Sequence, residues 1–256
     1  MKRLKLLRLL CCLMALVWLN LAVWADAPPQ PPPEPAAAPT PRPARVSREV
    51  QKHGYLFEEW VHATFFDNYQ LENYTQEWDV PATHNKRYGG VPVSIKFTKY
   101  GTSVDLGDAL RQFHIDQDFL LIIGYWRQEG NRKRIVNLVG ATVNPKLWKS
   151  LWSPITYDDL TKLDAVVKDR TLEHRRAAAE AKRLKSAPPF TGAVMTVNPK
   201  IDDKGQRRLQ CSLRFDFVFE RLAPKADPRP LTSPQLFGVP APEPFLSSPR
   251  TFNRPK

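Results

Sequence analysis

The chain has 256 residues, of which 25 are proline, and its formal net charge at neutral pH is +12. This length suits one domain of moderate size with extensions, because proline-rich segments at both ends contribute little to a hydrophobic core. The positive charge favours a polyanionic partner such as nucleic acid, or an anionic membrane surface, but it also suits a basic protein whose charge serves only solubility.

Residues 1–25 predict a bacterial-type secretory signal peptide. A basic start precedes an apolar run from Leu9 to Trp24, and small residues flank a cleavage point before Asp26. We therefore expect an exported protein, periplasmic or secreted. The alternative is an uncleaved inner-membrane anchor, for which the apolar run is barely long enough, and membrane contact is expected through this segment alone.

Cleavage would remove four basic residues and no acidic ones, which lowers the net charge from +12 to +8. It would also remove two of the three cysteines and leave Cys211. A single cysteine excludes an intramolecular disulfide and a thiolate metal cluster, so stability must come from the hydrophobic core.

Three segments follow the signal peptide. Residues 26–46 are rich in proline and alanine and predict an extended linker. Residues 47–222 are the expected domain. Residues 223–256 predict an irregular proline-rich tail, whose Phe237, Phe245 and Leu246 can pack back on the domain.

Within residues 47–222, hydrophobic periodicity predicts a mixed α/β domain. The first element, residues 47–66, has apolar side chains at helical spacing and leaves Glu58 and Glu59 off the apolar stripe. The two most apolar β segments, 119–126 and 134–143, are expected to be the central strands. The other expected elements are strands at 74–80 and 91–98, helices at 103–116, 157–168 and 172–184, and a C-terminal β-ribbon of strands at 193–197 and 209–221.

Four motifs occur in a fixed order between Gly54 and Val143. They are GYLFEEWV at 54–61, WDVP at 78–81, VSIKF at 93–97 and VDLGDALRQF at 104–113. In this order the chain resembles the PD-(D/E)XK nuclease superfamily, and within it the type II restriction endonucleases. The resemblance implies a restriction-endonuclease-like mixed central sheet flanked by helices, with a C-terminal β-ribbon.

The resemblance also implies a site for phosphodiester hydrolysis. Asp79 would bind Mg²⁺, or Mn²⁺ in its place, and Glu58 would complete the metal shell. Lys96 would position or activate the hydrolytic water. A pair of carboxylates that holds a hard cation, next to a lysine, is what this reaction requires.

One position departs from the family pattern. The family normally carries Asp or Glu two residues before the lysine, whereas this chain has Ser94. Serine is a weak neutral ligand, so another carboxylate, Glu58 or Asp108, would have to compensate. The sequence leaves open whether Glu58 or the neighbouring Glu59 faces the site, and whether Ser94 abolishes activity.

The segment 200–214 carries donors suited to phosphates and base edges. These are Gln206, Arg207, Arg208 and Gln210, and the segment resembles a DNA-contacting ribbon of restriction enzymes. An exposed, positively charged hairpin without a ligand explains the same residues equally well. The chain has no glycine-rich phosphate loop or dinucleotide fingerprint, so no nucleotide cofactor is expected, and its histidines are too scattered for a zinc motif.

These features predict an exported, Mg²⁺-dependent DNA endonuclease, with homodimerisation expected by analogy because duplex DNA presents two strands. Export fits poorly with a restriction role, which belongs to the cytoplasm. Two alternatives remain open. One is a catalytically weakened DNA-binding protein of the same fold, and the other is an envelope-associated structural protein.

Overall fold

The computed structural model describes residues 49–70 and 77–246. The predicted signal peptide and linker lie outside these residues, as do residues 74–76 of the first predicted strand. In the remainder of that strand, Val80 makes only an isolated bridge to Val93. Across the two described ranges, no helix is both long enough and apolar enough to cross a membrane.

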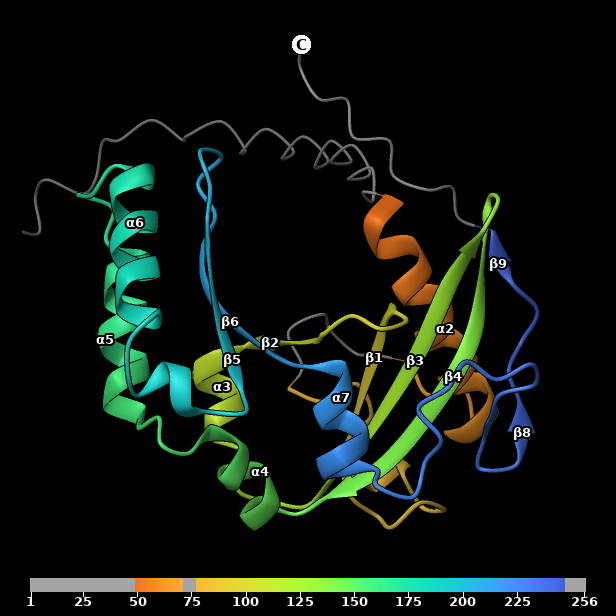
Figure 1. Ribbon diagram of the computed structural model, residues 1–256. Coiled ribbons are helices and arrows are strands. Elements are labelled where there is room, and N and C mark those ends of the chain that lie inside the picture. Colours follow the sequence, from red (N-terminus) through yellow and green to blue (C-terminus); the bar gives the residue numbers. More distant parts are fainter. Residues whose placement is uncertain (1–48, 71–76, 247–256) are drawn as a thin grey trace, which may run out of the picture. The chain divides into compact units, whose positions relative to one another are not determined.

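The elements alternate between helices and strands (Figure 1). This arrangement confirms the predicted mixed α/β class. In chain order the elements are α2 (Glu49–Phe65), η1 (Ala82–His84), β1 (Val93–Lys99), β2 (Val104–Asp108), α3 (Ala109–Phe113), β3 (Phe119–Glu129), β4 (Arg132–Val143), α4 (Pro145–Trp152), α5 (Tyr157–Lys168), α6 (His174–Lys185), η2 (Phe190–Gly192), β5 (Thr196–Ile201), β6 (Arg207–Leu213), α7 (Phe215–Phe217), η3 (Val218–Leu222), β7 (Gln235–Leu236), β8 (Val239–Pro240) and β9 (Phe245–Leu246).

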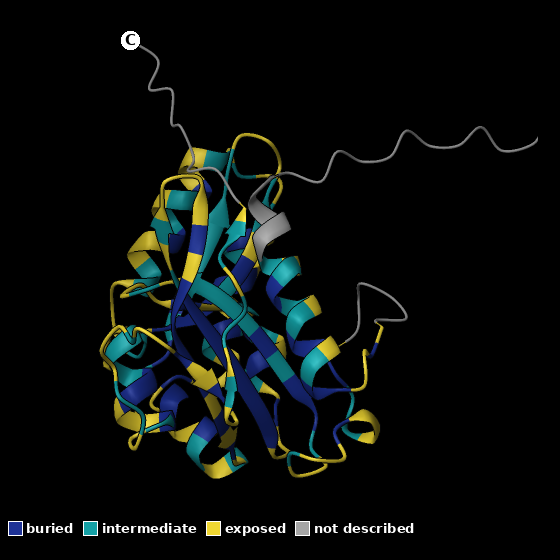
Figure 2. Cartoon of the chain, turned by 90° about the vertical axis from the view of Figure 1, so that its right-hand side faces the viewer, coloured by how far each residue is buried: buried dark blue, intermediate teal, exposed yellow. Residues whose placement is uncertain are grey.

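The main sheet has the strand order β1-β3-β4-β9, with β1 parallel to β3 and the other pairs antiparallel. Its central strands are β3 and β4, as the apolar runs predict. Residues 119–125 of β3 are all buried, because both faces of the strand are covered. Figure 2 shows the buried residues gathered along these strands and on the helix faces that pack on them.

Helix α2 covers one face of the main sheet and confirms the amphipathic helix predicted for residues 47–66. Phe57 and Val61 are fully buried on its apolar stripe. Phe57 reaches the sheet at Gly124, where a Cβ atom would lie 2.6 Å from the phenylalanine ring. Only glycine permits this close approach, which holds α2 against β1 and β3.

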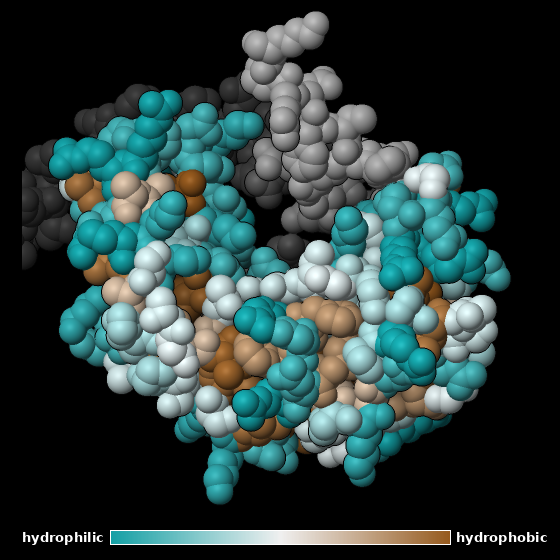
Figure 3. Space-filling model, viewed as in Figure 1, coloured by the Kyte–Doolittle hydropathy of each residue, from teal (hydrophilic) through white to brown (hydrophobic). Residues whose placement is uncertain are grey.

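The second sheet has the strand order β2-β6-β5 and is antiparallel. Helices α5 and α6, both predicted from the sequence, pack on this sheet, which buries Val197, Leu209 and Cys211. The alternate residues of β5 and β6 lie on the opposite face. Figure 3 shows the hydrophilic lobe built from α5, α6 and the β5–β6 hairpin, and a hollow that separates it from the lobe of the main sheet.

Two sequence predictions are wrong in this region. The helix predicted over residues 103–116 is instead strand β2 followed by the short helix α3. The reason is local: Gly107 has a φ of +90°, a β-bulge interrupts the pairing of β2 with β6, and the Asp108 side chain caps α3 by accepting from the Arg111 N–H at 2.9 Å.

The strand predicted over residues 209–221 ends at Leu213, and residues 215–222 are helical. The phenylalanines that suggested strand alternation also have helical spacing. Phe215 and Phe219 lie one helical turn apart, and both rings contact Tyr125 on the main sheet. Tertiary packing on Tyr125 therefore decides between two periodicities that both fit the local sequence.

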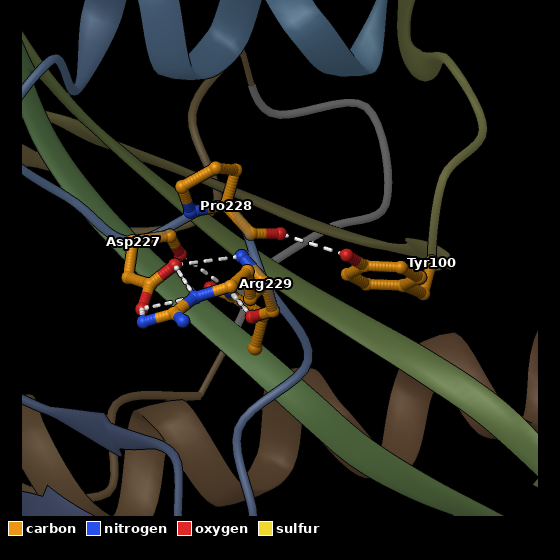
Figure 4. Close-up of polar contacts among 5 residues, drawn as sticks. Tyr100, Asp227, Pro228 and Arg229 are labelled. Atoms are coloured by element: carbon orange, nitrogen blue, oxygen red, sulfur yellow. Dashed lines mark hydrogen bonds and ion pairs between the residues drawn. The ribbon is translucent and has the colours of Figure 1, made fainter.

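Residues 223–246 pack along the main sheet. Phe237 stacks on Tyr88 and Phe245 contacts Phe97, whereas Leu246 is 64% exposed. Asn137 of β4 donates to the carbonyls of residues 227 and 229, and the Tyr100 hydroxyl donates to the carbonyl of residue 228 at 2.8 Å (Figure 4). These bonds fix the segment against the middle of β4 and the residue that follows β1.

Candidate active site

Asp79 and Lys96 form an ion pair beside β1, the edge strand of the main sheet. The backbone of residues 79 and 80 pairs with Val93 of β1, which directs the Asp79 carboxylate along that strand. Its Oδ2 atom accepts from the Ile95 N–H at 2.5 Å and lies 3.3 Å from the Lys96 Nζ atom. The two side chains keep 27% and 22% of their surface exposed, so the pair lies at the edge of the interior.

Glu58 of α2 lies close to both members of this ion pair. Burial, and to a lesser extent the negative charge of Asp79, raise the pKa of its carboxyl from 4.5 to about 7, against the opposing effect of the positive charge of Lys96. Two carboxylates that repel each other in a partly buried place favour either a shared proton or a bound cation. The structure therefore brings together all three predicted catalytic residues, from three separate elements.

The choice between Glu58 and Glu59 is settled by their positions on α2. Glu59 is exposed. Its side chain forms a hydrogen bond with Tyr55, which raises the pKa of the Tyr55 phenol. Glu58, in contrast, lines a cavity of about 200 Å³ together with Lys96. Glu58 is thus the glutamate that faces the site.

A further carboxylate, Asp105, lines the same cavity. Sequence reasoning missed it because residues 103–116 were predicted to be helical. In the structure Asp105 lies on β2, opposite Ser212 of β6, and its Oδ1 accepts from the Gly107 N–H at 3.0 Å. The signal that was available was the alternation of buried Val104 and Leu106 with exposed Asp105, which is a strand pattern.

Ser94 and Asp108, the two other residues that the sequence suggests for this site, have different surroundings. Ser94 donates a hydrogen bond to Asp79 Oδ2 at 3.4 Å, so it holds the carboxylate in place. Asp108 caps α3 and does not line the cavity. The sequence-based suggestion that Asp108 compensates for Ser94 gains nothing from this position.

The oxygen atoms around the ion pair suit a hard cation. Besides the two carboxylates, the backbone carbonyl of Ile95 points at the site and accepts from Lys96 Nζ at 3.0 Å. Mg²⁺ keeps several waters and is commonly bound by one or two carboxylates, so Glu58 and Asp79 fit it. In the part of the chain that the structure describes, no group of three or more His, Cys, Asp or Glu side chains is placed to hold a metal ion.

His62 lies on α2, one helical turn after Glu58, and contacts the backbone of Asp79. It is 6% exposed, and its Nε2 atom has no hydrogen-bond partner among the described residues. Burial lowers the pKa of its imidazole, against the charge of Asp79 and a hydrogen bond to the Asp79 backbone. A neutral imidazole therefore packs against the residue that carries the ion pair.

The four predicted DNA-binding residues separate into two groups. Arg207 donates to the backbone carbonyl of Leu172 at 2.8 Å and so joins the hairpin to the α5–α6 loop. Gln206 lies in the hairpin turn, where its N–H donates to Asp202. Arg208 and Gln210 lie on the face of the ribbon opposite to the residues that pack on α5 and α6.

The open face of the ribbon leads directly to the cavity. Residues that lie opposite each other in antiparallel strands share a face. The register therefore defines three rows of side chains, which together we call the ribbon face. The rows are Lys200 with Arg208, Asn198 with Gln210 and Asp108, and Thr196 with Ser212 and Asp105.

No family model, curated protein or solved structure matches this chain. The functional argument therefore rests on the geometry of the cavity and of the ribbon face.

Proposed function

We propose that the chain is a metal-dependent endonuclease that hydrolyses DNA phosphodiester bonds in a restriction-endonuclease-like domain. The observation that carries this proposal is the convergence of Glu58, Asp79 and Lys96 from α2, the bridge before β1, and β1. Each residue alone has an ordinary structural explanation. Glu58 and Lys96 line one cavity, and Asp79 is ion-paired with that lysine. A lysine beside two carboxylates, one of which has a pKa of about 7, matches the requirements of the reaction.

In this mechanism Glu58 and Asp79 would hold the cation. Mg²⁺ would supply Lewis-acid polarisation of the phosphate and an activated water. Lys96 keeps its ammonium beside this site through its bonds to Asp79 and the Ile95 carbonyl, where it stabilises the negative charge that develops on the phosphate. Because the pKa of the Glu58 carboxyl is about 7, Glu58 would have to give up its proton to act as a ligand at neutral pH.

The choice of DNA as substrate is supported by charge and by the ribbon face. The chain carries 38 basic and 26 acidic residues. Lys200 and Arg208 form a basic row at the outer end of the ribbon face, and Asp105 joins its inner end to the cavity. A nucleic-acid backbone bound along this face passes over the candidate catalytic residues.

The direct test uses the purified full chain and supercoiled plasmid. We expect nicked and linear products with Mg²⁺ or Mn²⁺ and none with a chelator. The second candidate, a DNA-binding protein without catalytic activity, is favoured by Ser94 in place of an acidic ligand. It predicts that plasmid is retained but not cut under both conditions.

The remaining parts of the proposal have separate tests. A chain that retains no DNA at low salt would favour the envelope-associated structural protein. Export is tested with a reporter fused to residues 1–46, which is expected to be active only outside the cytoplasm. Homodimerisation is tested by light scattering of the protein bound to duplex DNA.

A further inference from the structure

We propose that Asn198 and Gln210 form a base-reading pair that selects adenine near the cleaved phosphate. This inference rests on the proposed DNA substrate and adds sequence specificity to it. It assigns a role to Asn198, to which no function has been given above, and it separates the residues that read bases from those that contact phosphates.

The two amides lie directly opposite each other on the ribbon face. Both side chains are partly exposed, and they alternate with Val197, Leu209 and Cys211, which are buried on the face that α5 and α6 cover. Asn198 Nδ2 donates to the Ser212 hydroxyl at 2.8 Å and to the Thr196 carbonyl at 3.4 Å, which fixes the orientation of the amide, so Asn198 offers a base its oxygen as an acceptor. Among the described residues the amide of Gln210 has no hydrogen-bond partner, so both its donor and its acceptor are available.

The chemistry of these groups suits one base in particular. Adenine presents an acceptor and a donor side by side in the major groove, and the amide of Asn or Gln matches this pair with two hydrogen bonds. A two-stranded β-ribbon also has the width that the major groove admits. The β5–β6 hairpin therefore provides both the shape and the hydrogen-bonding groups for reading adenine.

The position of the pair within the ribbon face supports this role. Lys200 and Arg208 lie two residues further out along the strands and carry the charge that suits phosphates. Ser212 and Asp105 lie two residues in the other direction, beside the cavity. Two residues of a strand span about 7 Å, roughly the rise of two base pairs, so the selected base lies a few base pairs from the cleaved bond.

The experiment selects bound duplexes from a randomised library, using the full chain without divalent metal so that no DNA is cut. We expect an adenine-containing consensus for the wild type. In Asn198→Ala and Gln210→Ala the preference for adenine at that position should fall by roughly 5- to 100-fold. Gln235→Ala, an exposed amide on β7, is the matched control and should keep the wild-type consensus.

A further variant separates base reading from mere folding defects. Gln210→Glu replaces the donor by an acceptor and should move the preference from adenine towards cytosine, whose amino group a carboxylate accepts. Lys200→Ala should instead weaken binding to all sequences equally and reduce its salt dependence. Thermal melting confirms that each variant is folded.

Two results would overturn the inference: a wild type with no base preference, or a preference unchanged in Gln210→Ala. Plasmid cleavage, measured separately, keeps the two proposals apart. A chain that cuts DNA at random positions retains the nuclease proposal and loses the base-reading pair. A chain that selects adenine-containing sites but cuts nothing retains the base-reading pair and loses the nuclease.

Discussion

Replacing Glu58 by glutamine should stabilise the metal-free protein, and the gain should depend on pH. The folded protein raises the pKa of this carboxyl from 4.5 to about 7, so the ionised form is disfavoured in the native state. The contribution of Glu58 to stability is therefore fully present below about pH 4.5 and is lost as the pH rises through about 7. A pKa difference of about 2.5, at 1.36 kcal/mol for each pH unit, gives a loss of about 3 kcal/mol.

Glutamine keeps the shape of the side chain and cannot ionise, so Glu58→Gln avoids this loss. We expect its free energy of unfolding in urea to exceed that of the wild type by about 3 kcal/mol near pH 8.5, and to equal it near pH 4.5. Glu59→Gln is the matched control, because Glu59 is exposed on the same helix, and it should show no such pH-dependent gain.

Magnesium should remove most of this stability difference at high pH. A cation held by Glu58 and Asp79 stabilises only the folded wild type, by about 2.7 kcal/mol at a concentration one hundred times its Kd. The difference between the wild type and Glu58→Gln should then almost vanish near pH 8.5. Equal stability of the two proteins at both pH values without metal would refute the assignment of Glu58 to a partly buried site beside Asp79.

Three other substitutions test the fold and the ribbon face. Gly124→Ala places a methyl group against the Phe57 ring and should lower the free energy of unfolding by about 1–3 kcal/mol in urea titrations; an unchanged midpoint would contradict the close contact of α2 with β3. Arg207→Ala leaves the Leu172 carbonyl without its donor and should lower the melting temperature while leaving DNA affinity intact. Arg208→Ala should do the opposite: its melting temperature is unchanged, and the salt dependence of DNA binding falls by about one counterion, as fluorescence anisotropy at several salt concentrations can show.

Much of the fold could be predicted because its elements have clear periodic patterns. The apolar stripe of α2 and the apolar run of β3 each allow one interpretation only. Helix α4 also had a readable signal, since Asn144 caps it and Pro145 occupies its first position, although it was not predicted. The errors occurred at residues 104–113 and 215–222, where a β-bulge and contacts with Tyr125 decide the local structure.

The site could be predicted in part. The motif order indicated Asp79 and Lys96, and the structure joins them in an ion pair. Local periodicity could not separate Glu58 from Glu59, because both lie off the apolar stripe and only the packing of α2 on the main sheet buries one of them. Asp105 was missed because its strand was predicted as helix.

The ribbon shows the same limit. Adjacent residues of a strand point to opposite faces, so Arg207 and Arg208 cannot both contact one ligand. Which of them faces outward depends on the side that α5 and α6 cover, and the sequence of the ribbon does not contain this information. The strand register also adds Asn198 and Lys200 to the ribbon face, and both come from β5, whereas Gln210 lies on β6.

The most direct test of the hydrolytic site is the rate of duplex DNA cleavage by Lys96→Ala under saturating Mg²⁺, compared with Lys99→Ala. Lys99 is an exposed lysine on the same strand, so it controls for the loss of one positive charge. We expect Lys96→Ala to lose cleavage by roughly 100-fold or more while it still binds DNA, and Lys99→Ala to cut at the wild-type rate. Equal rates for the two variants would contradict the assignment of Lys96, Asp79 and Glu58 to one catalytic site.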